Sequence, residues 1–453
     1  MNVHLIAIGG SAMHNMAIAL YQKGFNITGS DDEIFEPSKA RLKKLGLLPD
    51  AEGWFPEKIH NKLDAIIVGM HARKDNPELL RATELGLKIF SYPEYVYEQS
   101  KNKLRIVIGG SHGKTTTTAM ILHVMKECGV ECDYLVGAQL DGFDCMVRFS
   151  ETAKITVIEG DEYLSSPTDL RPKFHLYHPH IALLSGIAWD HINVFPTFEN
   201  YVEQFSIFLD KIESGGSLIY CDSDPEVKKL ALQHSGKFKK IAYNTHPHVV
   251  ENGKTFLVVG SEKIPLKVFG NHNLQNLNGA LNVCREAGIH EQDFYKAIQS
   301  FSGAARRLEL VKETSSSVMY KDFAHSPSKL KATTAAFKQQ FPSRKLIACM
   351  ELHTFSSLNA KFLAEYNGAM EEADEALVYF NPHTIEHKKL AAISTEQVRE
   401  AFGTSNVVVY TDSKLLMNDL RAKSWNKKNL LLMTSGNFDG VDFVELADQL
   451  LIS

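Results

Sequence analysis

Short apolar runs alternate with longer amphipathic stretches along most of the chain. The runs VHLIAI, FNIT, DAIIV and KIF predict strands within the first hundred residues, and the stretches between them have the spacing of helices. The pattern resumes at RIVIG, KITVIE and HIALL, and again at MYKDF, RKLIACM, EALVYF, VVVY and LLLM. Strands that alternate with helices indicate doubly wound parallel sheets. The sequence therefore predicts an α/β fold.

The length of 453 residues is too great for one ordinary domain and favours about three. The polar stretch from Glu98 to Arg105 predicts a linker, and a polar hinge precedes LELV near residue 303. We therefore expect domains at residues 1–100, 101–302 and 303–453.

The composition excludes several classes of protein. A net charge of −5 argues against a general nucleic-acid binder. The six cysteines form no C-x-x-C pair, which favours a reducing compartment. The start MNVHLIAIGGSAM lacks the features of a secretion signal, and no stretch has 18 consecutive apolar residues. We expect a cytoplasmic protein with no membrane partner, and the sequence carries no signal for an oligomeric state.

The segment RIVIGGSHGKTTTT has the pattern of a phosphate-binding turn. A strand is predicted over Arg105–Ile108 and a helix over Lys114–His123, so the glycines lie in the turn between them. Amide N–H groups, the positive end of the helix and the ammonium of Lys114 would then face the same anion. The candidate residues are Gly110, Ser111, His112, Gly113, Lys114, Thr115 and Thr116. The standard P-loop spacing would place a glycine at Ile108, so this loop is shorter, and a turn that only packs strand against helix is the alternative.

Two further strand ends carry polar side chains. Glu159 ends the run KITVIE, and His191 follows the run that begins at HIALL. Because open α/β sheets bind ligands at the carboxyl ends of their strands, Glu159, His191 and the Thr115 hydroxyl could meet at one Mg²⁺ ion. Glu159 and His191, each taken alone, are equally well explained as solvated strand ends.

The first turn of the chain has a degraded dinucleotide fingerprint. It reads Ala7, Gly9, Ala12 where three glycines are preferred, and Asp31 follows about 20 residues later. A nicotinamide-dependent oxidoreductase is one interpretation, and a site for another diphosphate, such as that of a nucleotide sugar, is the second. Asp31 could equally be a cap at the end of a strand.

Two later segments carry candidate nucleotide contacts. Gly270 turns the chain into a predicted helix whose beginning contains His272, Asn273 and Asn276, which could cap the helix or contact a nucleotide. Arg307, in the polar hinge, could be a surface charge or an arginine that approaches a γ-phosphate.

Six ordered motifs together resemble a known family. GGSHGKTTT, VIEGDEY, WDHINVF, GNHNLQN, GAARRLE and DFAHSP are similar in order and spacing to motifs of the ATP-dependent Mur ligases of peptidoglycan synthesis. The resemblance implies a Rossmann-like N-terminal domain for a UDP-sugar, a central P-loop ATPase domain and a Rossmann-like C-terminal domain that receives an amine. It also implies that ATP and Mg²⁺ are required. The γ-phosphoryl group would activate the lactyl carboxylate of UDP-N-acetylmuramate as an acyl phosphate, which an amine then attacks.

The resemblance also implies roles for individual residues. Lys114, Glu159, His191 and Arg307 would be catalytic, together with His325, which would orient or deprotonate the amine unless it is a structural residue of its turn. Thr115, Glu159 and His191 would hold the metal, and Asp322 would hold the ribose of ATP. The remaining ATP contacts would be the residues of the phosphate turn with His272, Asn273 and Asn276. The UDP-sugar contacts would be Gly9, Gly10, Ser11, Met13, Ser30 and Asp31.

Two branches of the family act on UDP-N-acetylmuramate, one adding L-alanine and the other adding L-alanyl-γ-D-glutamyl-meso-diaminopimelate during peptidoglycan recycling. The chain is more similar to the second, and its segment Ser435–Phe438 approximates that branch's S-N-G-G-F. The chain departs from the pattern in three places. Glu351–Ser356 stands where that branch has E-P-R-S-N-T, without its arginine, Ser326 replaces the second histidine of D-F-A-H-H-P, and Ala7 replaces the first glycine of the N-terminal turn. The tripeptide is the expected amine, L-alanine is the alternative, and a nucleotide-gated binding protein without ligation is a third interpretation.

Overall fold

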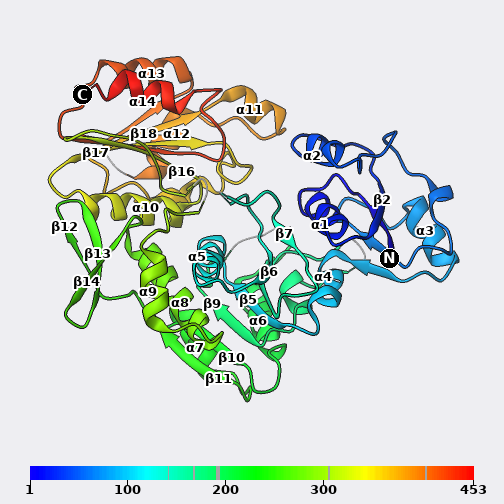
Figure 1. Cartoon of the computed structure of the whole chain (residues 1–453). Coiled ribbons are helices and arrows are strands. Elements are labelled where there is room, and N and C mark those ends of the chain that lie inside the picture. Colours follow the sequence, from blue (N-terminus) through cyan, green and yellow to red (C-terminus); the bar gives the residue numbers. More distant parts are fainter. Residues whose placement is uncertain (141, 167–168, 190–193, 305–306, 404–405, 453) are drawn as a thin grey trace. The chain divides into compact units, whose positions relative to one another are not determined.

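The computed structural model describes the chain except at residues 141, 167–168, 190–193, 305–306, 404–405 and 453. Figure 1 labels the helices and strands. They form two compact units, one comprising Met1–Thr245 and Gln275–Ile298, the other His246–Leu274 and Gln299–Ser453. We call them unit 1 and unit 2. Within the described part of the chain, no helix has the length and apolar character that a bilayer span requires.

The first sheet of unit 1 has four parallel strands in the order β2-β1-β3-β4. Its strands are β1 (Asn2–Ile6), β2 (Asn26–Ser30), β3 (Ala65–Val68) and β4 (Ile89–Ser91). The helices of this part are α1 (Ser11–Gln22), α2 (Ser38–Lys44), α3 (Pro77–Glu84) and α4 (Tyr92–Ser100), with a 3₁₀ turn at Pro56–Lys58. Every residue of β3 is buried, as expected for a parallel strand covered on both faces.

The second sheet of unit 1 has seven strands in the order β11-β10-β9-β5-β8-β6-β7. Its strands are β5 (Leu104–Gly109), β6 (Cys132–Leu135), β7 (Val147–Arg148), β8 (Ile155–Glu159), β9 (Ile181–Leu184), β10 (Ser217–Cys221) and β11 (Lys239–Tyr243). Its helical elements are α5 (Lys114–Glu127), η2 (Lys173–Leu176), α6 (Phe198–Asp210), α7 (Pro225–Gln233), α8 (Asn271–Glu286), which begins in unit 2, and α9 (Glu291–Ile298). Only β7 is antiparallel to its neighbour. Because β5 pairs with both β8 and β9, the residues that follow these three strands lie at one edge of the sheet.

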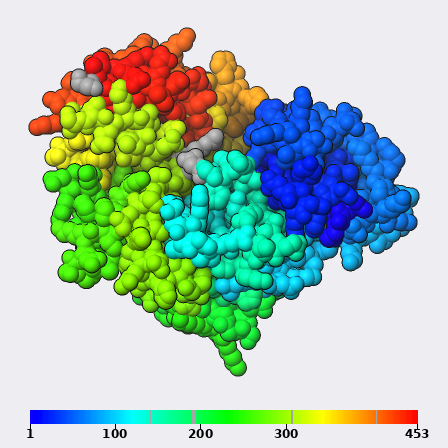
Figure 2. Space-filling view, viewed as in Figure 1, coloured from blue at the N-terminus to red at the C-terminus, as the bar shows by residue number. Residues whose placement is uncertain are grey.

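Unit 2 contains a six-stranded sheet in the order β15-β16-β20-β17-β18-β19, parallel except for β15, and a three-stranded antiparallel sheet. The large sheet consists of β15 (Glu309–Glu313), β16 (Val318–Asp322), β17 (Lys345–Leu352), β18 (Glu375–Phe380), β19 (Val407–Tyr410) and β20 (Lys428–Met433). The small sheet consists of β12 (His248–Glu251), β13 (Lys254–Val259) and β14 (Glu262–Leu266). The helical elements are α10 (Pro327–Gln340), η3 (Leu363–Tyr366), α11 (Pro382–His387), α12 (Thr395–Phe402), α13 (Ser413–Ala422) and α14 (Phe443–Leu450). Helices α13 and α14 form part of the molecular surface, shown in orange and red in Figure 2.

The α/β fold class predicted from the sequence is confirmed, and the three domain boundaries stay a prediction. The predicted linker at Glu98–Arg105 is shorter in the structure, because Glu98–Ser100 close α4 and Leu104 and Arg105 belong to β5, which leaves Lys101–Lys103 between them. A capping box between Ser91 and Glu94 begins α4, and tertiary packing of Tyr95 and Val96 extends the helix into the polar stretch.

Candidate functional site

The turn between β5 and α5 is shaped by two glycines with positive φ. Gly110 has φ +129° and Gly113, the residue before α5, has φ +80°. A Cβ atom at Gly110 would collide with Ser185 Oγ, and one at Gly113 would collide with Asn276 Oδ1. Both positions therefore require glycine, and the backbone approaches its neighbours more closely than any other residue would permit.

Lys114 lies at the centre of this turn. Its Nζ donates to Gly110 O and to Glu162 Oε2, each at 2.6 Å. Burial opposes the charged ammonium, but Glu162, Asp161 and Glu159 outweigh it and raise the pKa of Lys114 above its usual value. The side chain is therefore a permanent positive charge in a shielded position.

The carboxylate predicted at the end of β8 lies beside the first turn of α5. Thr115 Oγ1 donates to Glu159 Oε1 at 2.8 Å, and the Gly137 amide donates to Glu159 Oε2 at 3.0 Å. Burial raises the pKa of the Glu159 carboxyl, although the Gly137 amide and Lys114 offset part of that effect. Thr116, on the same helical turn as Thr115, is buried.

The end of β9 forms the other wall of the turn. Ser111 N donates to Gly186 O at 2.9 Å, and Ser185 Oγ donates to the backbone oxygen of His112. A Cβ atom at Gly186 would lie 2.5 Å from the His112 ring, so the imidazole lies directly over this glycine. The structure thus brings the whole predicted turn together with Glu159 and Asn276.

These residues fit a nucleotide and a magnesium ion. The first N–H groups of α5 have no intrahelical acceptor and point into the turn with the positive end of the helix, which suits phosphate. A hydroxyl and a carboxylate 2.8 Å apart are oxygen donors of the type that Mg²⁺ takes together with phosphate and water oxygens. Among the described residues, no three His, Cys, Asp or Glu side chains gather into a metal cluster. His191, the third predicted ligand, lies outside the described residues.

The first turn of the chain is tied to the end of β2. The Gly9 amide donates to Asp31 Oδ2 at 2.7 Å, and a Cβ atom at Gly9 would lie 2.9 Å from that oxygen. Asp31 is therefore not a helix cap but a support for the turn before α1. Its burial, together with Asp32, raises the pKa of Asp31 to about 6, although the Gly9 amide acts in the opposite direction. Ala7 occupies the position of the missing first glycine and still adopts φ +67°.

The other predicted sugar contacts surround the start of α1. Gly10 precedes the helix, Ser11 is exposed at its first position, and Ser30 is buried at the end of β2. Met13 is 4% exposed and belongs to the hydrophobic core. The roles of these residues in sugar binding stay predictions.

The predicted residues of unit 2 form two groups. Asp322 accepts from Leu308 N at 2.7 Å and Ala324 N at 2.6 Å, and the guanidinium of Arg307 lies 5.2 Å from the centre of the Phe323 ring. His325 Nδ1 lies 2.8 Å from Phe323 O. His272 and Asn273 lie at the start of α8, where Asn273 Nδ2 donates to Phe269 O at 2.9 Å. Their roles as ATP or amine contacts stay predictions.

Two segments of unit 2 that the sequence singled out separately meet at the ends of adjacent strands. Glu351, in β17, accepts hydrogen bonds from Thr434 Oγ1 and, at 3.0 Å, from Phe438 N. His353 Nδ1 lies 3.7 Å from Glu351 Oε1. Glu351–Ser356 and Ser435–Phe438 therefore form one site at the carboxyl edge of the sheet.

A pocket of about 720 Å³ opens beyond Phe438 at the same edge. Asp439 in its wall accepts from Tyr379 Oη and, at 2.8 Å, from Asn381 Nδ2. Lys414 and Arg421 of α13 also line it and supply positive charge. The pocket therefore offers groups of both signs to a ligand.

Several residues of the first site were missed by the sequence analysis. Glu162 and Tyr201 are the most important, because Tyr201 Oη donates to Glu162 Oε1 at 3.1 Å while Glu162 holds Lys114. Gly137 was also missed. Three carboxylates within the four residues EGDE were a signal for Glu162, whereas the sequence contained none for Tyr201, which comes from α6.

Comparisons with known proteins cover most of the chain. Three family models match it: "Mur ligase family, catalytic domain" over residues 2–103, "Mur ligase middle domain" over 108–284 and "Mur ligase, glutamate ligase domain" over 306–436.

Individual relatives differ in the amine that their names give. UDP-N-acetylmuramate–L-alanyl-γ-D-glutamyl-meso-2,6-diaminoheptandioate ligase of Haemophilus influenzae is 26% identical over 97% of both chains. UDP-N-acetylmuramate–L-alanine ligase of Arthrobacter sp. is 30% identical over 83% of this chain and 80% of its own. The crystal structure of UDP-N-acetylmuramate–alanine ligase MurC from Thermotoga maritima has a similar fold, with a TM-score of 0.67 at 20% identity over 97% of this chain and 96% of that one.

Proposed function

Because the chain belongs to the Mur ligase family of ATP-dependent amide-bond-forming ligases, we propose that it joins UDP-N-acetylmuramate to L-alanyl-γ-D-glutamyl-meso-diaminopimelate. The two segments at the ends of β17 and β20 and the pocket beside them would receive this tripeptide. The relative from H. influenzae, which is named for this tripeptide, supports the choice.

The observation that carries the choice of amine is the size of the pocket at the edge of the unit 2 sheet. A volume of about 720 Å³ lies within the range of pockets that hold drug-sized ligands, whereas L-alanine would fill a small part of it. Lys414 and Arg421 suit the carboxylates of a peptide, and Asp439 suits an ammonium group. L-Alanine is the second candidate, because the relative from Arthrobacter is named for it and His353 stands where the tripeptide branch has arginine.

The proposed reaction has two steps. A lactyl carboxylate oxygen attacks the γ-phosphorus of ATP, so that a C–O–P bond forms and ADP leaves. The amine then attacks the carbonyl carbon and loses a proton, and phosphate departs with one oxygen of the original carboxylate. Both steps crowd negative charge, so a fixed cation placed where that charge develops is the main requirement.

The residues of the turn meet that requirement. Lys114, held by Glu162 and Gly110, would face the β- and γ-phosphates. Thr115 and Glu159 would hold Mg²⁺, which neutralises phosphate charge when bound. The proposed ligand set is completed by His191.

His325 is the proposed acceptor of the proton from the amine. A carbonyl only accepts, so His325 Nδ1 must donate its hydrogen to Phe323 O, and Nε2 is then the basic nitrogen of the neutral ring. Tyr366 Oη donates to the backbone oxygen of His325 at 2.6 Å and fixes the turn that carries the ring.

The test is amide formation by the purified chain with ATP, UDP-N-acetylmuramate and either amine, followed by mass spectrometry and ADP release. We expect kcat/KM to be greater for the tripeptide. Lys414→Ala should lower that value about tenfold by removing one charged contact, while Lys263→Ala, which removes an exposed lysine of β14, should not. Efficient turnover with L-alanine and none with the tripeptide would reverse the assignment.

A further inference from the structure

The first helix of the chain contacts the segment that precedes β7. Asn15 of α1 is 5% exposed, and its Oδ1 accepts a hydrogen bond from Met146 N at 3.0 Å. Cys145 Sγ donates to Asn15 O at 3.3 Å. A buried amide that bonds to the backbone of a distant segment fixes the position of that segment, because leaving either group unpaired is unfavourable.

This contact continues by hydrogen bonds to Glu159. Met146 O accepts from Val136 N at 2.9 Å. The next residue, Gly137, donates its amide to Glu159 Oε2 at 3.0 Å, and Glu159 Oε1 accepts from Thr115 at 2.8 Å. An unbroken series of backbone and side-chain contacts therefore runs from α1 to the proposed metal-binding pair.

The same asparagine is also bonded to the start of α1. Its Nδ2 donates to Ser11 O at 2.8 Å, at the turn where the sugar diphosphate is predicted to bind. Arg41 of α2 donates to the backbone oxygen of Asp144, next to the segment that Asn15 holds. The predicted sugar turn and the β7 segment thus share one buried side chain.

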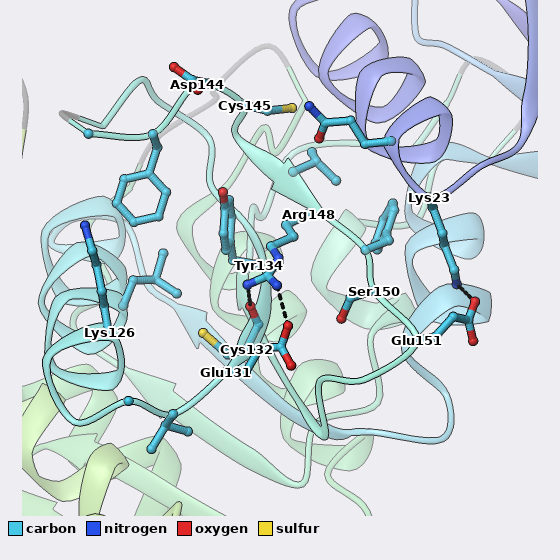
Figure 3. A pocket seen from close by; sticks show the side chains of 18 residues that line it. Lys23, Lys126, Glu131, Cys132, Tyr134, Asp144, Cys145, Arg148, Ser150 and Glu151 are labelled. Atoms are coloured by element: carbon cyan, nitrogen blue, oxygen red, sulfur yellow. Dashed lines mark hydrogen bonds and ion pairs between the residues drawn. The ribbon is translucent and has the colours of Figure 1, made fainter.

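The other side of the β7 segment is open. A pocket of about 810 Å³ lies beside it, lined among others by Lys23, Cys145 and Arg148 (Figure 3). Figure 3 shows Lys23, just after the end of α1, facing Glu151, and their side chains form an ion pair at 2.9 Å. Glu151 is 81% exposed, so this pair contributes little. The segment is therefore held by its pairing with β6, by Arg41 and by the buried contacts of Asn15, of which the last also reach the start of α1.

We propose that Asn15 is a positioning residue that couples the sugar-binding turn to Glu159 through Met146, Val136 and Gly137. The inference rests on the proposed function, in which Glu159 holds the metal beside the phosphates. Loss of the Asn15 side chain would release Met146, loosen the Gly137 amide and allow the Glu159 carboxylate to turn away from Thr115. Groups bonded directly to a metal ligand, as the Gly137 amide is to Glu159, typically change metal affinity about 10- to 100-fold when removed, and Asn15 acts through that amide.

The first experiment measures metal binding. Electron paramagnetic resonance with Mn²⁺ and the analogue AMP-PCP gives the dissociation constant of the metal for wild type and Asn15→Ala, and we expect about a tenfold increase. The matched control is Asn76→Ala, which removes another buried asparagine of the same sheet region, the cap of α3. We expect Asn76→Ala to lower the melting temperature by a similar amount and to leave Mn²⁺ affinity unchanged.

The second experiment needs no metal or nucleotide. Hydrogen exchange at the amide of Gly137 should be faster in Asn15→Ala than in wild type and unchanged in Asn76→Ala.

A double variant tests whether Asn15 acts through Glu159. In the Glu159→Gln background, Asn15→Ala should have little further effect on Mn²⁺ affinity, because the effects of residues in one chain of contacts are not additive.

The outcomes separate the two proposals. The coupling alone is overturned if wild type binds Mn²⁺ with nucleotide and Asn15→Ala has the same Mn²⁺ affinity and the same rate of exchange at Gly137. If wild type binds no Mn²⁺ in the presence of nucleotide, both the proposed function and the coupling are overturned.

Discussion

Lys114 and Glu162 form a buried ion pair beside the phosphate turn. Their side chains are 15% and 1% exposed, and the pair is completed by Tyr201 and by Gly110 O. Buried pairs of this kind contribute little net stability, yet removal of one partner leaves the other charge without compensation. Glu162 therefore holds the ammonium in place, and the ammonium in turn makes the burial of Glu162 tolerable.

Lys114→Met is expected to lower kcat about a thousandfold, because a fixed charge aimed at the developing phosphate charge is lost. It should also lower the free energy of unfolding by about 3 kcal/mol, because Glu162 remains buried without its cation. Urea unfolding and ADP release measure the two effects. The double variant Lys114→Met, Glu162→Gln should recover stability but not turnover, and recovery of both would show that Lys114 has no chemical role.

Asp31 should make stability depend on pH. The pKa of its carboxyl rises from 3.8 in the unfolded chain to about 6 in the folded one, so the folded state binds more protons between these values. The free energy of unfolding should consequently fall as pH rises from about 4 to about 6, by about 1–3 kcal/mol. Asp31→Asn keeps an acceptor for Gly9 and removes the ionisable carboxyl. The difference in free energy of unfolding between the variant and wild type should therefore favour the variant more at pH 7.5 than at pH 4.5. An equal difference at both pH values would contradict the assignment.

At the scale of elements, the β5–α5 turn depends on backbone geometry that one methyl group would disturb. Gly113 combines φ +80° with a close approach to Asn276, so both strain and collision oppose a side chain there. Gly129, after the end of α5, has φ +68° and no atom within 4 Å of a Cβ, so only strain applies. The two glycines form a natural comparison.

Gly113→Ala is expected to lower stability by about 2 kcal/mol and to raise KM for ATP about tenfold, because the turn must shift away from α8. Gly129→Ala should lower stability by about 1 kcal/mol and leave KM unchanged. Steady-state kinetics and urea unfolding of both variants provide the measurement. Equal KM values in the two variants would mean that the Gly113 turn does not contact the nucleotide.

Local sequence predicted the turn better than its surroundings. Lys114 and Thr115 stand directly after the glycines, and Glu159 ends an apolar run, so spacing alone placed them at strand ends. Tyr201 reaches the site from α6 and Gly137 from the segment after β6, and such contacts are set by tertiary packing that no local pattern records. Asp31 was ambiguous for the same reason, because its partner Gly9 lies 22 residues earlier.

At the scale of the whole molecule, three sheets that are parallel apart from β7 and β15 each present polar groups at the carboxyl ends of their parallel strands. The first carries the Gly9 turn and Asp31, the second the Lys114 turn and Glu159, and the third the Glu351 site with its pocket. This arrangement matches a reaction with three substrates, a sugar acid, a nucleotide and an amine. The proposed ligation requires that the phosphoryl group activates the sugar acid before the amine attacks.

Transfer of oxygen from the sugar acid to phosphate tests that requirement most directly. UDP-N-acetylmuramate labelled with ¹⁸O in its lactyl carboxylate would be turned over by wild type with ATP and the tripeptide, and the released phosphate would be analysed by mass spectrometry. We expect one ¹⁸O atom in each phosphate and an equal amount of amide product. Phosphate without label would mean that water, and not the carboxylate, attacks ATP, and would contradict ligation through an acyl phosphate.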